Sequence, residues 1–492
     1  MIQSPAISLW PHVPEVLLLA SSLVILVAGL FLRPERRKWL AGSAMFAVLA
    51  AMAAVIFQGA EPVKASAQDM LLADGYALFL KVALLAAAAL ALLFSIEYVE
   101  RTGLAQVEYY GLLLLSVAGM LLMVEAVNLV TIFLSLEVAS IALYVLVGLD
   151  RAEARSAAAS LKYLLLGAVA SAFLLYGMAL VYGQAGTTSL SGIEAFVDSL
   201  GEGMPPLLLV GLGLVVVGLG FKVALVPFHL WTPDVYAGAP TSVTAFMSVG
   251  VKVVGFAALG RVTLYAFAAA QGDWQWLLAG LAALTMTVGN LAALLEKDLK
   301  RLLAYSGVAQ AGYILVGLAA AGEEGVGGAL FYLFAYVFAN AAAFGVVIAV
   351  ARRHGADSRG DTLESYAGLA ERRPWLAVAM SLCLLSLAGF PPLAGFMSKL
   401  YVFASAIRGG MTWLAVVGVL NSAIAAYYYL RLIGLMVGRR ERQAPDVVPS
   451  GAVCPALIVG LALACLATVL LGIWPEPFLE WARAAARSLL GG

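Results

Sequence analysis

Charge is what this sequence has least of. Only 12% of its 492 residues are charged, whereas 63% are hydrophobic and the mean hydropathy is +0.97. In soluble domains about a quarter of the residues are charged, so the composition excludes a soluble globular protein and indicates one that crosses a membrane many times. The formal net charge is zero, which excludes a broadly basic surface for nucleic acid.

Cysteine is also scarce, and so are the motifs of covalent chemistry. Cys383, Cys454 and Cys465 lie in apolar runs without CxxC or Cys/His spacing, so we interpret them as packed core residues. The sequence contains no metal-ligand cluster, nucleophilic triad or phosphate-binding loop. We therefore expect no cofactor and no covalent chemistry in this chain. The N-terminus lacks the basic region of a signal peptide, so we expect the first apolar run to be a retained helix.

Long hydrophobic runs, by contrast, fill the sequence. A helix needs about 20 apolar residues to cross a bilayer, and windows of that size predict fourteen spans. They lie near residues 14–32, 38–58, 75–97, 107–124, 126–149, 157–182, 206–230, 241–266, 275–294, 301–320, 325–351, 374–404, 411–437 and 453–473. The predicted fold is an all-α polytopic membrane protein with about fourteen transmembrane helices.

The basic residues in the loops between these spans lie mainly on one side. Eighteen lie on that side and four on the other. By the positive-inside rule the first side is cytoplasmic, and both termini then face outward. The eighteen are Arg33, Arg36, Arg37, Lys38, Arg101, Arg151, Arg155, Lys297, Lys300, Arg301, Arg352, Arg353, Arg359, Arg372, Arg373, Arg439, Arg440 and Arg442, and the four are Lys64, Arg408, Arg483 and Arg487.

The remaining basic residues lie inside the predicted spans. A charge at the centre of a membrane helix costs about 2.5–3.5 kcal/mol unless it is paired or hydrated. Arg261 and Arg431 lie near helix ends, and we interpret them as snorkelling to the surface. Glu137, in the middle of the fifth span, is the expected counter-charge, whereas we interpret Glu125 as a solvated residue at the outer end of the fourth span. The seven basic residues are Lys81, Lys162, Lys222, Lys252, Arg261, Lys399 and Arg431.

Prolines interrupt two of the spans that carry these lysines. In GFKVALVPFHLWTPDVYAGAPTSVTAF, Lys222 precedes Pro227, and in LAGFPPLAGFMSKLYVF, Lys399 follows a Pro-Pro pair. Proline cannot continue a helix. Broken backbone at membrane depth is tolerated only where protein packs around it or water fills a cavity beside it. We therefore expect broken helices at spans 7 and 12, each next to a polar path.

The two broken spans are five helices apart and run in opposite directions. This arrangement predicts two inverted five-helix repeats, spans 4–8 and 9–13, as in many ion translocators. The predicted divisions are a three-helix segment (1–106), the two repeats (107–266 and 267–437), and a last helix with an amphipathic tail (438–492). We expect the tail to lie on the outer membrane boundary or against a neighbour, and a short helix over 191–200 to lie similarly.

Five ionisable residues inside the spans fit proton handling better than static pairing. Burial disfavours the charged form of lysine and a nearby carboxylate favours it. A lysine held between these effects exchanges its proton when a neighbour changes charge, whereas an arginine stays charged. The predicted relay consists of Glu137, Lys162, Lys222, Lys252 and Lys399.

Three histidines and one lysine lie outside this assignment. His229, just after Pro227, either passes protons or caps the broken helix. We interpret His12 and His354 as ordinary loop residues. Lys81 has no role assigned to it.

With these residues in view, the sequence resembles the antiporter-like subunits of respiratory complex I (NADH:quinone oxidoreductase). It looks most like the N-type members, the counterparts of mitochondrial NADH dehydrogenase subunit 2. The resemblance covers nearly the whole chain and is sharpest in LKYLLLGAVASAFLLYGMALVYGQAGTT, VPFHLWTPDVYAGAPTSVTAF, EKDLKRLLAYSGVAQAGY and GFPPLAGFMSKLYVF. It implies a fourteen-helix fold with inverted repeats. It also implies a proton path from a glutamate on helix 5 and lysines on helices 6, 7, 8 and 12, which are the five relay residues above.

The resemblance also implies a setting for the chain. Flavin, iron–sulfur clusters and quinone would belong to partner subunits, and the chain would translocate protons beside sister antiporter-like subunits in the bacterial inner membrane. Two other interpretations remain. Multi-subunit Na⁺/H⁺ antiporters and membrane-bound hydrogenases use related subunits, and a membrane scaffold would hold the same charges only as structural pairs. The WTPDVY…GAPT stretch favours the complex I family.

Overall fold

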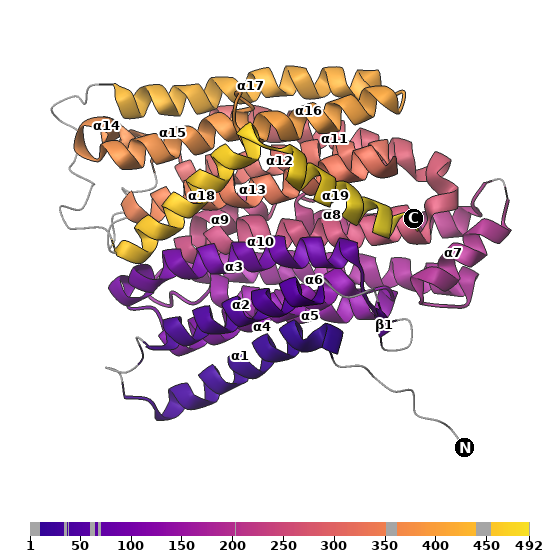
Figure 1. Cartoon of the computed structure of the whole chain (residues 1–492), viewed down its shortest axis with the longest axis horizontal. Coiled ribbons are helices and arrows are strands. Elements are labelled where there is room, and N and C mark those ends of the chain that lie inside the picture. The colour runs from indigo at the N-terminus through magenta and orange to yellow at the C-terminus, as the bar shows by residue number, and fades with distance from the viewer. Residues whose placement is uncertain are drawn as a thin grey trace.

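The structure, a computed structural model, describes residues 10–33, 37, 39–59, 64–66, 70–201, 203–350, 362–438 and 454–491. Most of these residues are helical, and the long helices run side by side in one bundle (Figure 1). In the first half the elements are η1 (Trp10–His12), α1 (Val13–Phe31), α2 (Trp39–Gln58), β1 (Lys64–Ser66), β2 (Leu71–Ala73), α3 (Gly75–Thr102), α4 (Gln106–Glu125), α5 (Leu129–Val147), α6 (Ala154–Ala185), α7 (Leu190–Ser199), α8 (Pro206–Val223), α9 (Thr232–Gly238), α10 (Thr241–Gly260) and η3 (Arg261–Ala266). In the second half they are η4 (Ala268–Ala270), α11 (Gln271–Leu295), α12 (Leu299–Ala320), α13 (Gly322–Val350), η5 (Leu363–Tyr366), α14 (Leu369–Arg372), α15 (Pro374–Ala388), α16 (Ala394–Arg408), α17 (Thr412–Val437), α18 (Pro455–Ile473) and α19 (Glu476–Leu489).

Thirteen helices in the described part of the chain are long and apolar enough to cross a membrane. The pair α15 and α16, separated by residues 389–393, supplies one further, interrupted crossing. The predicted all-α fold with about fourteen spans is confirmed. In Figure 1, α1 begins and α19 ends on the same side of the bundle, on the right, as an even number of crossings requires.

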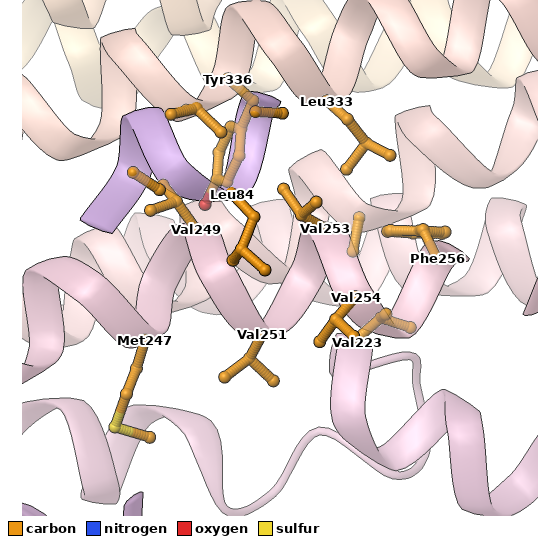
Figure 2. Packing of buried hydrophobic residues seen from close by; sticks show 14 of the residues in the cluster. Leu84, Val223, Met247, Val249, Val251, Val253, Val254, Phe256, Leu333 and Tyr336 are labelled. Carbon is orange, nitrogen blue, oxygen red and sulfur yellow. The ribbon is translucent and has the colours of Figure 1, made fainter. Parts of the chain in front are cut away.

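Three helices, α10, α12 and α13, form the centre of the bundle. The apolar stretch of α10 is entirely buried and those of α12 and α13 almost entirely, whereas α1, α2 and α6 expose wide apolar faces. Figure 2 shows the packing around α10, where Leu84 of α3 lies beside Val249 and Val253, with Leu333 and Tyr336 of α13 above them. This contact is an apolar layer, and such a layer excludes water from the space between the helices.

Both predicted helix breaks are confirmed. The helix α8 ends at Val223, ahead of Pro227, because Ala224 adopts a left-handed backbone (φ 63°) and its N–H closes the helix on the Gly220 and Phe221 carbonyls. The helix α15 ends at Gly389, which is also left-handed (φ 94°). Span 7 is therefore shorter than predicted, and span 12 consists of two half-helices. The division into inverted repeats stays a prediction.

The C-terminal amphipathic tail lies against its own chain. The helix α19 crosses α3 and α13 on one face of the bundle (Figure 1). The ring of Trp481 lies 4.5 Å from that of Phe79 on α3 and 6.0 Å from that of Phe334 on α13. The short helix expected over 191–200 is present as α7. Cys383 is buried, and all three cysteines are free, in keeping with a packing role.

Eight of the basic residues from which the membrane orientation was predicted lie outside the described part of the chain. The same holds for His354 and most of the polar interval after α13. The basic residues concerned are Arg36, Lys38, Arg352, Arg353, Arg359, Arg439, Arg440 and Arg442.

Arg261 does not snorkel, so that interpretation is wrong. Its side chain is 1% exposed, and its two terminal nitrogens each donate to a carboxylate oxygen of Asp74 at 2.7 Å. Asp74 also caps α3 by accepting from the Ala77 N–H at 2.8 Å. This bidentate pair joins the start of α3 to the end of α10. Because both side chains are buried, neither charge could be solvated by water if the pair separated. Arg431, by contrast, is exposed.

Replacing Asp74 with asparagine should destabilise the protein strongly. The Asp74→Asn side chain can still cap α3, but it leaves the Arg261 guanidinium buried without a counter-ion, which costs about 3–5 kcal/mol. The measurement is the thermal unfolding temperature of the purified assembly. The matched control is Arg408→Met, which breaks the exposed pair with Glu324 and should cost about 1 kcal/mol or less. Equal unfolding temperatures for the two variants would contradict the prediction.

Candidate functional site

Lys222 lies in the last turn of α8, with 5% of its surface exposed. Its ammonium donates to the Ser140 hydroxyl at 2.7 Å and to the Tyr144 hydroxyl at 3.4 Å, both on α5. The rings of Tyr144 and Tyr163 lie 5.5 and 5.6 Å from the ammonium nitrogen, and the faces of aromatic rings attract a cation. The lysine is therefore held by neutral groups that tolerate both its charged and its neutral form.

Glu137 lies on the same face of α5, one turn before Ser140, and is half-buried. Its carboxylate accepts a hydrogen bond of 2.5 Å from Ser171 on α6. In the described part of the chain, no carboxylate lies within ion-pair distance of Lys222. Glu137, the expected counter-charge, is therefore not in direct contact with Lys222 in this structure, where the ammonium bonds to Ser140 and Tyr144 instead.

A small cavity adjoins Lys222 on the side of α10. Its volume is about 10 Å³ and its lining includes Ser140, Tyr163, Val251 and Val254. This volume is close to the minimum that holds one water molecule. Val251 and Val254 flank Lys252 along α10, so the cavity lies between Lys222 and the helix that carries the next lysine.

Lys252 and Lys399 both bind the carbonyl ends of broken helices. The Lys252 ammonium donates to the Val223 carbonyl, at the end of α8, at 3.3 Å. The Lys399 ammonium donates to the Ala388 carbonyl, at the end of α15, at 2.9 Å. The last four carbonyls of a helix have no partner within the helix, and they attract cations. Each break thus supplies a buried acceptor for one lysine.

Gly389 makes room for Lys399. A Cβ atom at this position would lie 3.0 Å from Cδ of Lys399, and the φ of 94° is one that L-residues rarely adopt. On its other side, the Lys399 ammonium lies 4.4 Å from the centre of the Tyr313 ring on α12. The left-handed turn that ends α15 also shapes the site of this lysine.

Polar side chains on α12 and on the helices beside it extend from the surroundings of Lys252 to the end of α15, where Lys399 binds. Near Lys252, a Cβ atom on Gly307 would lie 3.8 Å from the lysine nitrogen and 3.1 Å from the Tyr336 hydroxyl. The adjacent Ser306 bonds to the hydroxyl of Tyr429 on α17. Ser306 and Gln310 of α12, Tyr332 of α13 and Tyr429 of α17 form one hydrogen-bonded set, which we call the α12 polar chain.

Gln310 is the centre of the α12 polar chain. Its amide nitrogen lies 3.4 Å from the Tyr429 hydroxyl and donates to the Leu387 carbonyl at 3.0 Å, and its oxygen accepts from the Tyr332 hydroxyl at 2.5 Å. Leu387 is next to Ala388, whose carbonyl binds Lys399. Hydrogen-bonded groups therefore extend from Ser306 to the carbonyls that end α15.

Lys162 lies apart from the other predicted relay residues. Its side chain is 41% exposed and forms an ion pair with Asp234 on α9, which Arg301 also contacts at 2.5 Å. Burial alone would raise the pKa of the Asp234 carboxyl, but the hydrogen bonds from Lys162 and Arg301 hold it below its ordinary value. These residues line a cavity of about 380 Å³ together with Arg155 and Asp298. Lys162 lies within α6, a helix long enough to cross the membrane, as expected, and its side chain lines this polar cavity.

His229 lies in the break between α8 and α9. It is 7% exposed, and its ring centre lies 6.3 Å from that of Tyr305 on α12. Its backbone carbonyl accepts from the Thr232 N–H at 2.9 Å, at the start of α9. Thus the backbone of His229 contributes to the short helix, and its ring lies between the break and α12.

Comparison with known proteins identifies the family of this fold. The family described as NADH:quinone oxidoreductase/Mrp antiporter, transmembrane region, matches residues 126–425, which include all five predicted relay residues. The chain belongs to this family. The match begins just before α5 and ends within α17, so it covers both helix breaks and every member of the α12 polar chain except Tyr429.

Full-length relatives within the family are similar along almost the entire chain. The NADH-quinone oxidoreductase subunit N of Trichlorobacter lovleyi is 42% identical over 96% of this chain and 96% of its own length. The corresponding subunit N 2 of Roseiflexus castenholzii is 43% identical over 95% and 94%. A chain of respiratory complex I from Thermus thermophilus superposes with a TM-score of 0.79 at 35% identity, covering 95% of this chain and 98% of that one.

Two neighbours outside complex I share the fold. Chains of an archaeal membrane-bound sulfane sulfur reductase and of the Mrp complex from Dietzia sp. each superpose with a TM-score of 0.84 at 24% identity. They cover 98% of this chain. At 24% identity this similarity shows a shared fold and does not show a shared activity.

Sequence reasoning missed the neutral members of this site. Ser140, Gln310 and Tyr429 are ordinary residues for a membrane helix, and nothing in the sequence marks them as partners of a lysine. A partial signal is the helical spacing of Ser306, Gln310 and Tyr313 on α12. Buried polar side chains at intervals of three and four residues lie on one face of a helix, so a polar stripe within an otherwise apolar span can be found.

The interpretations of Glu125 and His12 are wrong. Glu125 is fully buried and not solvated, and it forms an ion pair with Lys81 on α3. His12 bonds to the other Glu125 oxygen at 2.8 Å. The hydropathy pattern places Glu125 at the end of its span, but it does not reveal that α1 and α3 cover that end.

Proposed function

We propose that this chain is a proton-translocating N-type subunit of a bacterial NADH:quinone oxidoreductase. The observation that carries the proposal is the set of buried lysines Lys222, Lys252 and Lys399, each bonded to neutral oxygen atoms near a helix break. A lysine without a fixed counter-ion in a dry site is poised between its charged and neutral forms. Such groups suit transfer of protons from one lysine to the next.

The proposed transfer begins at Lys222. A charge that arrives from a neighbouring subunit near Glu137 changes the electrostatic potential at Lys222. Lys222 lies on α8 and contacts the same face of α5 through Ser140. Lys222 then releases its proton through a water in the adjoining cavity towards Lys252. From there the α12 polar chain leads to Lys399. The pocket around Lys162 and Asp234 supplies protons from the aqueous phase.

The remaining features of the proposal follow from the same family. Sister antiporter-like subunits are the neighbours, and NADH oxidation, flavin, iron–sulfur clusters and quinone belong to other subunits. The chain lies in the inner membrane with both termini outside, as the basic residues favour. Leu134 and Ile141, which flank Glu137 on α5, are 57% and 58% exposed. A carboxylate within so apolar a surface favours a neighbouring subunit over lipid as its cover.

A second candidate function is a subunit of a multi-subunit Na⁺/H⁺ antiporter. The Mrp chain has the same fold, but its identity is lower than the 42% shared with a subunit N. That difference favours the oxidoreductase.

The first test is purification of the tagged chain from its host membrane. We expect it to purify within a large assembly that reduces quinone with NADH. Purification with a few other antiporter-like subunits and no redox activity would contradict the proposal and favour the Na⁺/H⁺ antiporter.

Removing the amine of Lys222 should uncouple or slow proton movement. In Lys222→Ala no amine remains beside the Ser140 cavity to carry a proton, and a positioned proton-transfer group raises the rate of its step. We expect the initial rate of NADH-driven acidification in inverted membrane vesicles to fall several-fold. The control is Lys297→Ala, which removes an exposed lysine and should leave this rate unchanged. An unchanged rate in Lys222→Ala would refute the scheme.

Interrupting the α12 polar chain should have a similar effect without removing a lysine. Gln310→Leu keeps the size of the side chain but breaks its bonds to Tyr332, Tyr429 and the Leu387 carbonyl. We expect vesicle acidification to fall several-fold relative to wild type while the complex still assembles. Gln275→Leu, which removes a bond to the Ala319 carbonyl at the other end of α12, is the matched control. Equal acidification by the two variants would exclude the α12 polar chain from the path.

A further inference from the structure

A second group of buried ionisable residues lies among α1, α3 and α4, outside the predicted relay. The Lys81 ammonium forms ion pairs with Glu15, at 2.6 Å, and with Glu125. Nδ1 of His12 lies 2.8 Å from the second oxygen of Glu125. We call these four residues the Lys81 cluster. It lies on the side of the bundle where α1 and α3 begin and α4 ends.

The Lys81 cluster is almost completely removed from solvent. Exposure is 0% for Lys81 and Glu125, 3% for Glu15 and 6% for His12. With a charged lysine, two carboxylates and a neutral imidazole, the group carries a net charge of −1. An uncompensated charge in a dry interior is costly, and the usual response is uptake of a proton. One added proton makes the cluster neutral.

The position of the added proton follows from the hydrogen bonds. Glu125 accepts from both Lys81 and His12, so its charge is well stabilised. Among the side chains that the structure describes, only the Lys81 ammonium pairs with the Glu15 carboxylate, and the backbone N–H of Glu15 is the other donor near it. Two carboxylates that share one cation rarely both remain ionised. Glu15 is therefore the group that holds the proton.

We propose that the Lys81 cluster is a second proton-binding site of this protein, which binds one exchangeable proton on Glu15. His12, the least buried member, connects the site to the aqueous side. The inference concerns proton binding alone and does not depend on the proposed function.

The Lys81 cluster is separated from the relay. One turn along α3 from Lys81, Leu84 lies 3.4 Å from where a Cβ on Gly250 of α10 would be. Figure 2 shows Leu84 beside Val249 and Val253 in the apolar layer of this contact. The further charges that face the cluster are Arg261, the first residue of η3 directly after α10, and its partner Asp74, which neutralise each other. A proton on Glu15 therefore exchanges with its own side of the membrane and not with Lys252.

A metal ion is the competing occupant. Ligand atoms of His12, Glu15 and Glu125 lie within 4.8 Å of one another. The Lys81 ammonium, however, already contacts both carboxylates, and a metal ion would have to share them with a fixed positive charge. One proton brings the cluster from −1 to neutral, whereas a divalent metal ion would leave it at +1, so the charge balance favours a proton.

Infrared difference spectroscopy of the purified assembly tests the inference without NADH or quinone. Spectra are recorded while the pH is raised, for wild type and for Glu15→Gln, whose side chain mimics the protonated acid and should preserve the fold. We expect a carboxylic-acid C=O band in wild type that disappears at high pH and is missing in Glu15→Gln. The control Glu323→Gln, at an exposed pair with Arg487, should keep the band.

A conservative variant distinguishes the site from a purely structural ion-pair cluster. Glu15→Asp keeps a carboxyl group, so its band should persist at a shifted frequency. Superimposable spectra of wild type, Glu15→Gln and Glu15→Asp would overturn the inference, whether or not the chain pumps protons. Loss of the wild-type band on adding Zn²⁺ at a fixed pH, with no pH dependence in its absence, would instead assign the cluster to a metal.

Discussion

Unsatisfied backbone carbonyls at two helix breaks are the constraint on which this structure depends. Inside a membrane every backbone polar group needs a partner within the protein. The ends of α8 and α15 leave carbonyls without partners in their own helices, and Lys252 and Lys399 bind them. Each interaction solves two problems, because the lysine also needs a polar partner. The breaks and the lysines therefore stabilise one another.

The burial of α12 gives these separate sites a connection. This helix lies between the two breaks, and one of its faces carries Ser306, Gln310 and Tyr313 among apolar residues. Partners from α13, α17 and the end of α15 complete their hydrogen bonds. A buried polar network of this kind is stable only when most of its members are satisfied. The requirement for satisfied hydrogen bonds thus produces a polar network from Ser306 to the Leu387 carbonyl within an otherwise apolar centre.

The sequence was sufficient for the features that follow a single helix. Hydropathy predicted the spans, proline predicted both breaks, and scarcity of charge singled out the buried lysines. It was insufficient for contacts between helices distant in the chain. Lys81 pairs with Glu125, Arg261 with Asp74 and Lys162 with Asp234, and no local pattern specifies these choices. The position of a residue along its membrane span can be predicted from the sequence. The helix that packs against a given face of that span cannot.

The lysines of the predicted relay and the lysine of the Lys81 cluster differ in the groups that they contact. Lys222, Lys252 and Lys399 contact neutral oxygens and aromatic rings, so proton loss leaves no unpaired anion beside them. Lys81 contacts two carboxylates, so its charge is fixed by them. Proton exchange there falls to a carboxylate. In the proposed function the same residue type thus serves as a proton carrier in one setting and as a counter-ion in the other, and the number of adjacent carboxylates distinguishes the two settings.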